Sequence, residues 1–273
     1  MRTLVFLNSI AAVRRLVPLL QSLNIPAHAL HSEMPQKARL RSIERFSSAS
    51  APSSVLVATD VAARGLDIPA VQLVIHYHVP HAADMYVHRS GRTARADNSG
   101  SSVLLCSPDE VQGMRRLVAK VHARSENLDK KHFITTIELD PRVLARIKPR
   151  IALSKKITDA TLAKEKHNQE DNWLRNAAEE LGVDYDSEEF ANTQGSQKGR
   201  GKGRKKREKE ARSLSKEELA SLRAQLKAEL RTRVNVGVSE RYITAGGLDI
   251  DSLLQEKEKG QFLGKMEIDG LTV

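Results

Sequence analysis

Cysteine is nearly absent from this chain, whose 273 residues include a single one, Cys106. One cysteine allows no intrachain disulfide and no cysteine-rich metal site, which suits a reducing compartment. Long apolar runs are also missing, since none approaches the roughly 20 residues of a membrane-spanning helix, and the first 20 residues lack the pattern of a secretory signal. These absences predict a soluble, intracellular protein with no membrane partner. Cys106, within "SSVLLCS", is predicted to be a buried strand residue.

Acidic residues are too few to balance the basic ones, and the chain has a formal net charge of +10 and a pI of about 9.7. Residues 1–150 hold 21 Lys and Arg against 12 Asp and Glu, whereas residues 151–273 hold 23 against 22. The excess positive charge therefore belongs mostly to the first part of the chain. It favours a polyanionic partner such as nucleic acid, with an acidic membrane surface as the weaker alternative.

Short apolar runs alternate with helical patterns over the first 150 residues. The runs, rich in Val, Leu and Ile, lie at 3–7, 54–58, 72–77 and 101–106. Apolar residues recur at helical spacing over 11–23, 36–46 and 108–123. Strands buried on both faces read as continuous apolar runs, so the pattern predicts an α/β domain with a parallel sheet and helices on both faces, ending near Arg150.

The composition changes after residue 150, and we expect three further segments. A helical extension with an acidic cluster covers 151–197, a basic low-complexity linker covers 198–212, and an amphipathic helix with a C-terminal tail covers 213–273. The helix should begin at Ser215, which forms a capping box with Glu218. Its apolar stripe consists of Leu219, Leu222, Leu226 and Leu230. We expect this stripe to pack on the folded domain or on a partner.

Two dense stretches, "TDVAARGLDIP" from Thr59 and "HRSGRTAR" from His88, follow predicted strands. Ligands of such sheets bind beyond the carboxyl ends of the strands. In the first stretch a glycine lets a backbone approach a ligand, and Arg64 can serve a phosphate or an interdomain contact. In the second, arginines recur every three residues, which on a helix places them along one side. That side is either a solvated basic face or a phosphate site, and spacing alone does not choose between them.

The same residues resemble a known family. "ATDVAARGLDIPAVQLVIHYHVP" followed by "YVHRSGRTAR" closely resembles the fifth and sixth conserved motifs of the DEAD-box RNA helicases. "TLVFLNS" is similar to their fourth motif and "MPQKAR" to the Q-x-x-R element that follows it. The resemblance covers about residues 2–150 and implies the second of two RecA-like domains.

The resemblance implies roles around the nucleotide. Arg92 and Arg95 would be arginine fingers on the γ-phosphate of ATP, and His88 and Arg89 would couple the nucleotide site to the partner domain. Two further residues would contact the ribose side of the nucleotide: Gly65 and Asp67.

It also implies an RNA site. The RNA backbone would be held by Asn8, Ser9, Arg39, Thr59 and Arg64. The family usually has glycine where Ala94 stands and threonine where Ser9 stands; neither change should remove the function of its motif. His31 is expected to be structural.

The chain has no G-x-x-x-x-G-K-[ST] phosphate loop, no Asp-Glu-Ala-Asp box and no Ser-Ala-Thr motif. ATP with Mg²⁺ would therefore be held mainly by a first domain that these residues do not contain. Met1 stands directly before the fourth motif, which suggests a fragment of a longer helicase that is inactive alone. The alternative is a non-enzymatic RNA-binding assembly factor that retains only this domain.

The tail indicates a branch of the family. "NVGVSERYITAGGLDIDSLL" and "NWLRNAAEELGVD" are similar to the extension of nucleolar DEAD-box helicases that assemble the large ribosomal subunit. This implies pre-ribosomal RNA and pre-ribosomal proteins as partners, and the nucleus and nucleolus as location. Residues 198–209 would be a localisation signal or an RNA-binding strip, and are otherwise a solvated linker. Trp173 is expected to pack in the same way as the leucine stripe, on the folded domain or on a partner.

Overall fold

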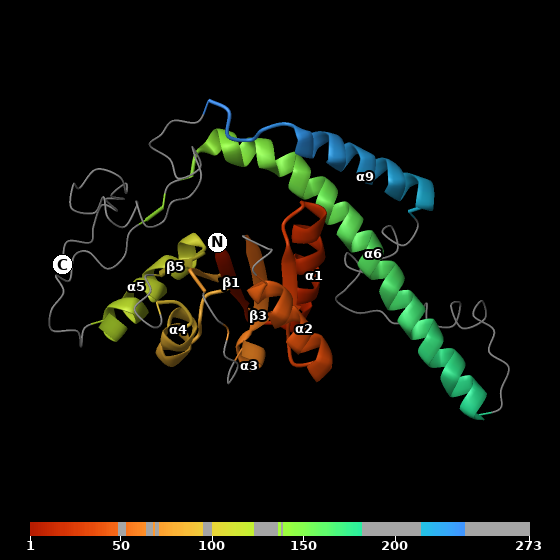
Figure 1. Cartoon of the computed structure of the whole chain (residues 1–273), viewed down its shortest axis with the longest axis horizontal. Helices are drawn as coiled ribbons and strands as arrows, with labels where there is room; N and C mark the ends of the chain where they lie inside the picture. Colours follow the sequence, from red (N-terminus) through yellow and green to blue (C-terminus); the bar gives the residue numbers. More distant parts are fainter. Residues whose placement is uncertain are drawn as a thin grey trace. The chain divides into compact units, whose positions relative to one another are not determined.

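Five short strands pair in parallel at the centre of the first part of the chain (Figure 1). The structure is a computed structural model that describes residues 1–48, 53–63, 68, 71–94, 100–122, 136–137, 139–181 and 214–237. The strands are β1 (Arg2–Leu7), β2 (Ala27–Leu30), β3 (Ser54–Thr59), β4 (Leu73–His76) and β5 (Ser101–Leu104). Their order is β2-β3-β1-β4-β5. The chain thus crosses β1 between β3 and β4, and the crevice for a ligand is expected at the carboxyl ends of these three strands.

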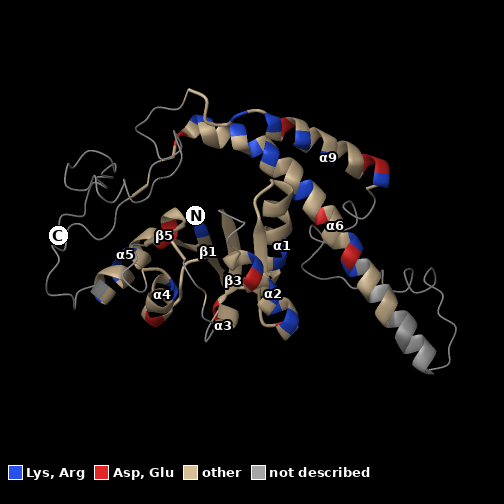
Figure 2. Ribbon diagram, in the orientation of Figure 1, with Lys and Arg blue, Asp and Glu red and all other residues tan. Residues whose placement is uncertain are grey.

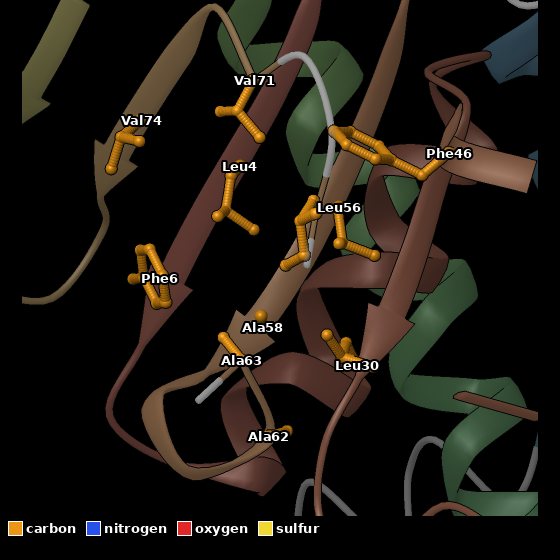
Figure 3. Close-up of a cluster of buried hydrophobic side chains, with 11 residues drawn as sticks. Leu4, Phe6, Leu30, Phe46, Leu56, Ala58, Ala62, Ala63, Val71 and Val74 are labelled. Carbon is orange, nitrogen blue, oxygen red and sulfur yellow. The ribbon is translucent and has the colours of Figure 1, made fainter. Parts of the chain in front are cut away.

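Helices cover both faces of the sheet. They are α1 (Ile10–Ser22), α2 (Gln36–Ser47), α3 (Asp60–Ala63), α4 (Ala83–Ser90) and α5 (Pro108–His122). In β1, Leu4 and Phe6 belong to a cluster with Phe46 of α2 (Figure 3), whereas Val5 belongs to a second cluster with Val13 of α1. Alternate residues of β1 thus pack into two different hydrophobic clusters, one with α2 and one with α1. A parallel sheet with helices on both faces, the predicted fold class, is therefore confirmed.

The predicted long elements are present within one or two residues, and three short elements were not predicted: β2, α3 and α4. The prediction for Cys106 was wrong, because β5 ends at Leu104 and Cys106 lies half-buried in the following loop. Burial raises the pKa of its thiol, and the nearby Glu110 carboxylate raises it further.

Two compact units divide the chain, one formed by Met1–Lys148 with Arg233–Val273 and the other by Pro149–Thr232. The division falls within α6 (Pro141–Leu181), which runs through the boundary that we predicted at Arg150. Among the described helices none is both long and apolar enough to cross a membrane. Figure 2 shows Lys and Arg along α6, which between 141 and 164 has seven of them against one acid, Asp159.

The second unit contains α9 (Lys216–Arg231), which begins with the predicted capping box. The Ser215 N–H donates to Glu218 Oε2 (2.7 Å), and the Glu218 N–H donates to Ser215 Oγ (3.0 Å). Lys164 Nζ donates to the Leu214 carbonyl (2.7 Å), before α9, and Arg150 Nη2 donates to the Thr232 carbonyl (2.7 Å), after it. The two contacts place α9 antiparallel along the 150–164 segment of α6.

The leucine stripe of α9 is buried at Leu219 and Leu226 and half-buried at Leu222. The hydrogen bonds at the two ends of α9 reach α6 of the same unit, whereas we expected the stripe to pack on the folded domain or on a partner. Trp173 is 69% exposed on α6, so it does not pack on the folded domain, and its packing on a partner stays a prediction. The basic run, the acidic cluster and most of the segment similar to nucleolar helicases lie outside the described residues.

Candidate functional site

One arginine joins the carboxyl ends of the three central strands. Arg89 lies in the last turn of α4 and is only 1% exposed. Its Nε donates to Asp60 Oδ1 and its Nη2 to Asp60 Oδ2, both at 2.6 Å, so Asp60 after β3 is held by two parallel bonds. Nη2 also donates to Asn8 Oδ1 (2.6 Å) after β1, and Nη1 donates to the His78 carbonyl (2.8 Å) after β4. Planar bidentate pairing of this kind is the strongest geometry for arginine and carboxylate.

The buried position of Arg89 excludes one of the two interpretations of the arginine repeat for this residue. A solvated basic face is wrong for Arg89, whose guanidinium also lies 5.3 Å from the centroid of the Phe6 ring. The arginines do not share one helix face either, because α4 ends at Ser90 and Gly91 caps it. Arg89 supports the site from within the domain, and any coupling to a partner domain would pass through the groups it binds.

Asn8 is bound on every side by its own domain. Its backbone N–H donates to His78 Nδ1 (3.1 Å), and its Nδ2 donates to the Val79 carbonyl (3.1 Å) and lies 3.0 Å from His81 Nε2. Its Oδ1 accepts from Arg89. These bonds fix the turn at the end of β1, in which Asn8 itself is exposed.

Ser9 is placed by this turn at the start of α1. It is the N-cap of α1, and its Oγ accepts from the Ala12 N–H (3.3 Å). That bond leaves the hydroxyl hydrogen able to donate to a phosphate oxygen. The N–H groups of the first helical turn provide positive potential at the same end. Serine therefore preserves the hydroxyl that the related motif supplies with threonine.

The turn after α4 carries Arg92, which is half-buried. Next to it, Thr93 is buried and its Oγ1 donates to the Val71 carbonyl (2.7 Å). Ala94 has φ of 55°, a left-handed conformation that glycine adopts at less cost. A Cβ on Gly100 would meet Thr93 Oγ1 and lie 2.7 Å from the Ala94 nitrogen, so only glycine fits there without a shift. Thr93 and Gly100 thus fix the backbone that presents Arg92.

Arg39 and Thr59 lie on the β3 side of this edge. Arg39 Nη2 donates to the Ala62 carbonyl of α3 (3.1 Å), and its Nη1 donates to Gln36 Oε1 (3.2 Å). Thr59 ends β3 and is buried. His31 follows β2 and is also buried; burial lowers its pKa, the Arg14 guanidinium lowers it further, and Glu33 opposes both. A neutral buried imidazole agrees with the structural role expected for His31.

A second buried histidine lies beneath the site. His76 Nε2 is 3.1 Å from Ser102 Oγ and 3.3 Å from Ser90 Oγ, and its ring stacks on Tyr86 with centroids 5.6 Å apart. Burial lowers the pKa of His76 to about 4, the nearby Arg89 guanidinium adds to the decrease, and Asp60 opposes it. His76 is therefore neutral at pH 7 and supports α4 from below.

The structure brings together Asn8, Ser9, Thr59, Arg39 and Arg89 near one edge of the sheet. His88 is exposed on α4. Four predicted site residues lie outside the described residues: Arg64, Gly65, Asp67 and Arg95. Five supporting residues were not predicted: Asp60, His78, His81, Thr93 and Gly100. Only Asp60 gave a usable signal, because it directly follows the run 54–58.

The chemistry of this edge suits anions more than metal ions. Arg39 brings positive charge to it, and the Asp60 carboxylate is paired with Arg89. Within the described ranges, no group of three or more His, Cys, Asp or Glu could hold a metal ion. A phosphate-containing ligand fits the donors that are present.

The sequence is similar to a family model and to known helicases. Residues 1–97 match the family model for the helicase conserved C-terminal domain. The chain is 62% identical to the ATP-dependent RNA helicase mak5 of Sclerotinia sclerotiorum, over 99% of this chain and 35% of the relative. It is 64% identical to the mak5 helicase of Neosartorya fischeri, over 97% of this chain and 34% of the relative. The chain thus spans about a third of the length of the curated relatives it matches.

A solved structure is also similar over part of the chain. The Escherichia coli DEAD-box protein SrmB, bound to regulator of ribonuclease activity A, has 38% sequence identity and a TM-score of 0.40, and the match covers 45% of this chain and 68% of that one.

Proposed function

This chain carries the C-terminal helicase domain of the DEAD-box RNA helicases, and from that premise we propose that it is the second half of an ATP-dependent enzyme that remodels RNA. The observation that carries the proposal is the buried Arg89–Asp60 pair at the carboxyl ends of three parallel strands, three residues before Arg92, whose backbone N–H donates to the Arg89 carbonyl (3.1 Å). Ligands bind at such a position in doubly wound sheets.

Arg92, together with Arg95, would hold the terminal phosphate of ATP and stabilise the charge that develops on it. Gly65 and Asp67 would contact the ribose side. When bound between the two domains, ATP would supply the phosphoanhydride bond to its γ-phosphate, and hydrolysis with product release would let the domains separate again. We assign Mg²⁺ mainly to a first domain, because this sequence has no G-x-x-x-x-G-K-[ST] phosphate loop and no Asp-Glu-Ala-Asp box.

The RNA backbone would lie across the opposite part of the edge. Ser9 offers a hydroxyl and the N-terminus of α1, and Arg39 offers its charge near α3. Thr59 and Arg64 complete the proposed contacts. Backbone contacts bind RNA without reading its sequence, so selection of the RNA target would depend on the tail.

We further propose a role in large ribosomal subunit assembly, with pre-ribosomal RNA and pre-ribosomal proteins as partners and the nucleolus as location. The support is the similarity of 172–184 and 235–254 to the extension of nucleolar helicases, and the basic run at 198–209. Imaging of the fluorescently tagged protein tests the location, and diffuse cytoplasmic signal would contradict it.

The activity is tested by fusing this chain behind the first domain of a DEAD-box helicase from a close relative. The chain alone should show no RNA-stimulated ATP hydrolysis, and the fusion should show it. In the fusion, Arg92→Ala or Arg95→Ala should lower the hydrolysis rate by about 10³ or more, the effect of an arginine finger, with little change in ATP affinity. Arg116→Ala, at an exposed arginine of α5, is the matched control and should keep the parental rate.

Two outcomes would redirect the proposal. Parental hydrolysis rates in both finger variants would remove the arginines from the reaction. A fusion that binds RNA but never hydrolyses ATP would favour the alternative function, a non-enzymatic RNA-binding assembly factor.

A further inference from the structure

Two histidines hold Asn8 from the segment between β4 and α4. His78 Nδ1 lies 3.1 Å from the Asn8 backbone nitrogen, and His81 Nε2 lies 3.0 Å from Asn8 Nδ2. Both histidines are about 70 residues away from Asn8 in the sequence, so these contacts join the end of β1 to the segment that follows β4. Neither histidine belongs to the predicted site.

The direction of each bond follows from the partners of Asn8. Its Oδ1 accepts from the Arg89 guanidinium at 2.6 Å, which fixes the orientation of the amide and makes Nδ2 the donor. His81 Nε2 must therefore accept, as His78 Nδ1 must accept from a backbone N–H. An imidazole nitrogen accepts only when it carries no proton, so both rings must be neutral for these two bonds to exist.

The charges around the two rings come from several elements. Arg89 of α4 donates to the His78 carbonyl, Asp60 of α3 pairs with Arg89, and Glu110 of α5 interacts electrostatically with His78. Asp84 lies in the first turn of α4, after His81, and the first turn of α1 has no acidic residue. A proton on either histidine would turn an acceptor into a donor that faces an N–H of Asn8.

We propose that His78 and His81 are positioning residues that hold Asn8, and with it the turn into Ser9 and α1, and that they do so only as neutral imidazoles. Protonation of either ring breaks its bond to Asn8 and loosens the turn. Because Ser9 is a proposed RNA contact, the effect on RNA binding rests on the proposed function; the effect on Asn8 does not.

The structural claim is tested by amide NMR of the full chain between pH 8 and pH 5, the range over which histidines change charge. The Asn8 backbone resonance should shift together with the His78 ring, and the Asn8 side-chain resonances with the His81 ring. His78→Asn retains an acceptor that does not titrate, and should abolish the shift of the backbone resonance alone. His81→Gln should abolish the pH-dependent shift of the Asn8 side-chain resonances alone.

A control substitution separates this effect from general titration. His28→Asn lies on β2, two strands away from β1, and should leave both Asn8 shifts as in the parent. Asn8 resonances that do not move with pH, or that still move in the double variant His78→Asn with His81→Gln, would overturn the proposal.

The second arm measures affinity for a single-stranded decauridine RNA at pH 7.5 and fixed salt. His78→Phe with His81→Phe removes both acceptors and should weaken binding at least threefold, whereas the double variant with Asn and Gln should stay within twofold of the parent. If the NMR shifts follow the prediction and affinity does not change, the positioning role stands and the proposed RNA site at Ser9 fails. If the shifts are absent, the positioning role fails whatever the affinity.

Discussion

At the scale of single residues, the stability of the site depends on Arg89 being fully paired. Removing an arginine from water costs several kcal/mol, which only good geometry and further hydrogen bonds can offset. Asp60, Asn8 and the His78 carbonyl supply those bonds at 2.6 to 2.8 Å. The Arg89–Asp60 pair therefore adds little net stability to the domain. Loss of Asp60, however, would leave the buried charge of Arg89 without its counterion. The same dependence ties the three strand ends to one another.

His76 makes the stability of this domain depend on pH. Its pKa is lowered to about 4 in the folded protein, mainly by burial, and is about 6.5 in an unfolded chain. The unfolded state therefore binds the proton first as pH decreases, so the free energy of unfolding should decrease from about pH 6.5 down to about pH 4. Between pH 7 and pH 5 the loss from this residue should be about 2 kcal/mol, measured by urea unfolding followed by circular dichroism.

His76→Gln isolates that contribution, because glutamine does not titrate. The variant is expected to be less stable at pH 7, since its side chain cannot stack on Tyr86, but its decrease between pH 7 and pH 5 should be smaller than that of the parent by about 2 kcal/mol. An equal decrease in both proteins would show that another group causes the acid sensitivity.

At the scale of elements, the contact of α9 with α6 depends on an apolar stripe and on charged ends. Leu226 is 4% exposed in the middle of α9. Arg150 reaches the carbonyl and hydroxyl of Thr232 at 2.7 and 2.6 Å, where the helix has unpaired carbonyls and negative potential. Both features belong to the described part of the second unit.

Leu226→Asp should detach α9 from α6, because a charge would be forced against apolar surface. Trypsin cleavage after Arg223 and Lys227 should become at least about tenfold faster, as local opening exposes the helix. Ala224→Asp adds the same charge at an exposed position of α9 and is the control, expected to keep the parental cleavage rate. Equal rates in the two variants would mean that the stripe does not hold the helix.

Sequence patterns predicted the long elements well and the short ones poorly, for a physical reason. β2 and α3 have four residues each, too few to show a period, and β2 contains His28 between small residues. α4 has only eight residues, and the buried Arg89 interrupts its apolar face. The leucine stripe of α9 repeats over about three turns, so its period was clear.

For the site, the sequence predicted positions but not pairings. Arg39 and Thr59 were expected at this edge from motif resemblance, and the structure places both there. The Arg89–Asp60 pair joins residues 29 apart, and the Asn8–His81 contact joins residues 73 apart. Local spacing contains no information on such contacts, because they form only when strand order brings the ends together.

At the scale of the whole molecule, the charge is unevenly divided. Residues 1–150 have a net charge of +9, and the remaining residues have +1 in alternating acidic and basic blocks. Broad positive charge attracts RNA at long range, whereas a dense block can bind it directly. The densest block is 198–209, with eight Lys and Arg and one Glu in 12 residues.

If 198–209 binds RNA, it should contribute to the salt dependence of affinity, since each phosphate contact on a single strand contributes a slope of about 0.7 in log affinity against log salt. Replacing its eight cations with Gln should weaken binding to a single-stranded RNA. It should also reduce the slope by about 0.7 for each phosphate contact that is lost. The measurement is fluorescence anisotropy of the full chain from about 50 to 300 mM KCl.

A variant with the same 12 residues in scrambled order keeps the charge and should keep the slope, because phosphate binding does not depend on order. A localisation signal read by a receptor depends on order, so nuclear accumulation lost in both variants, with a slope lost only in the first, would assign both roles to the run. An unchanged slope and unchanged accumulation in the Gln variant would leave 198–209 as a solvated linker.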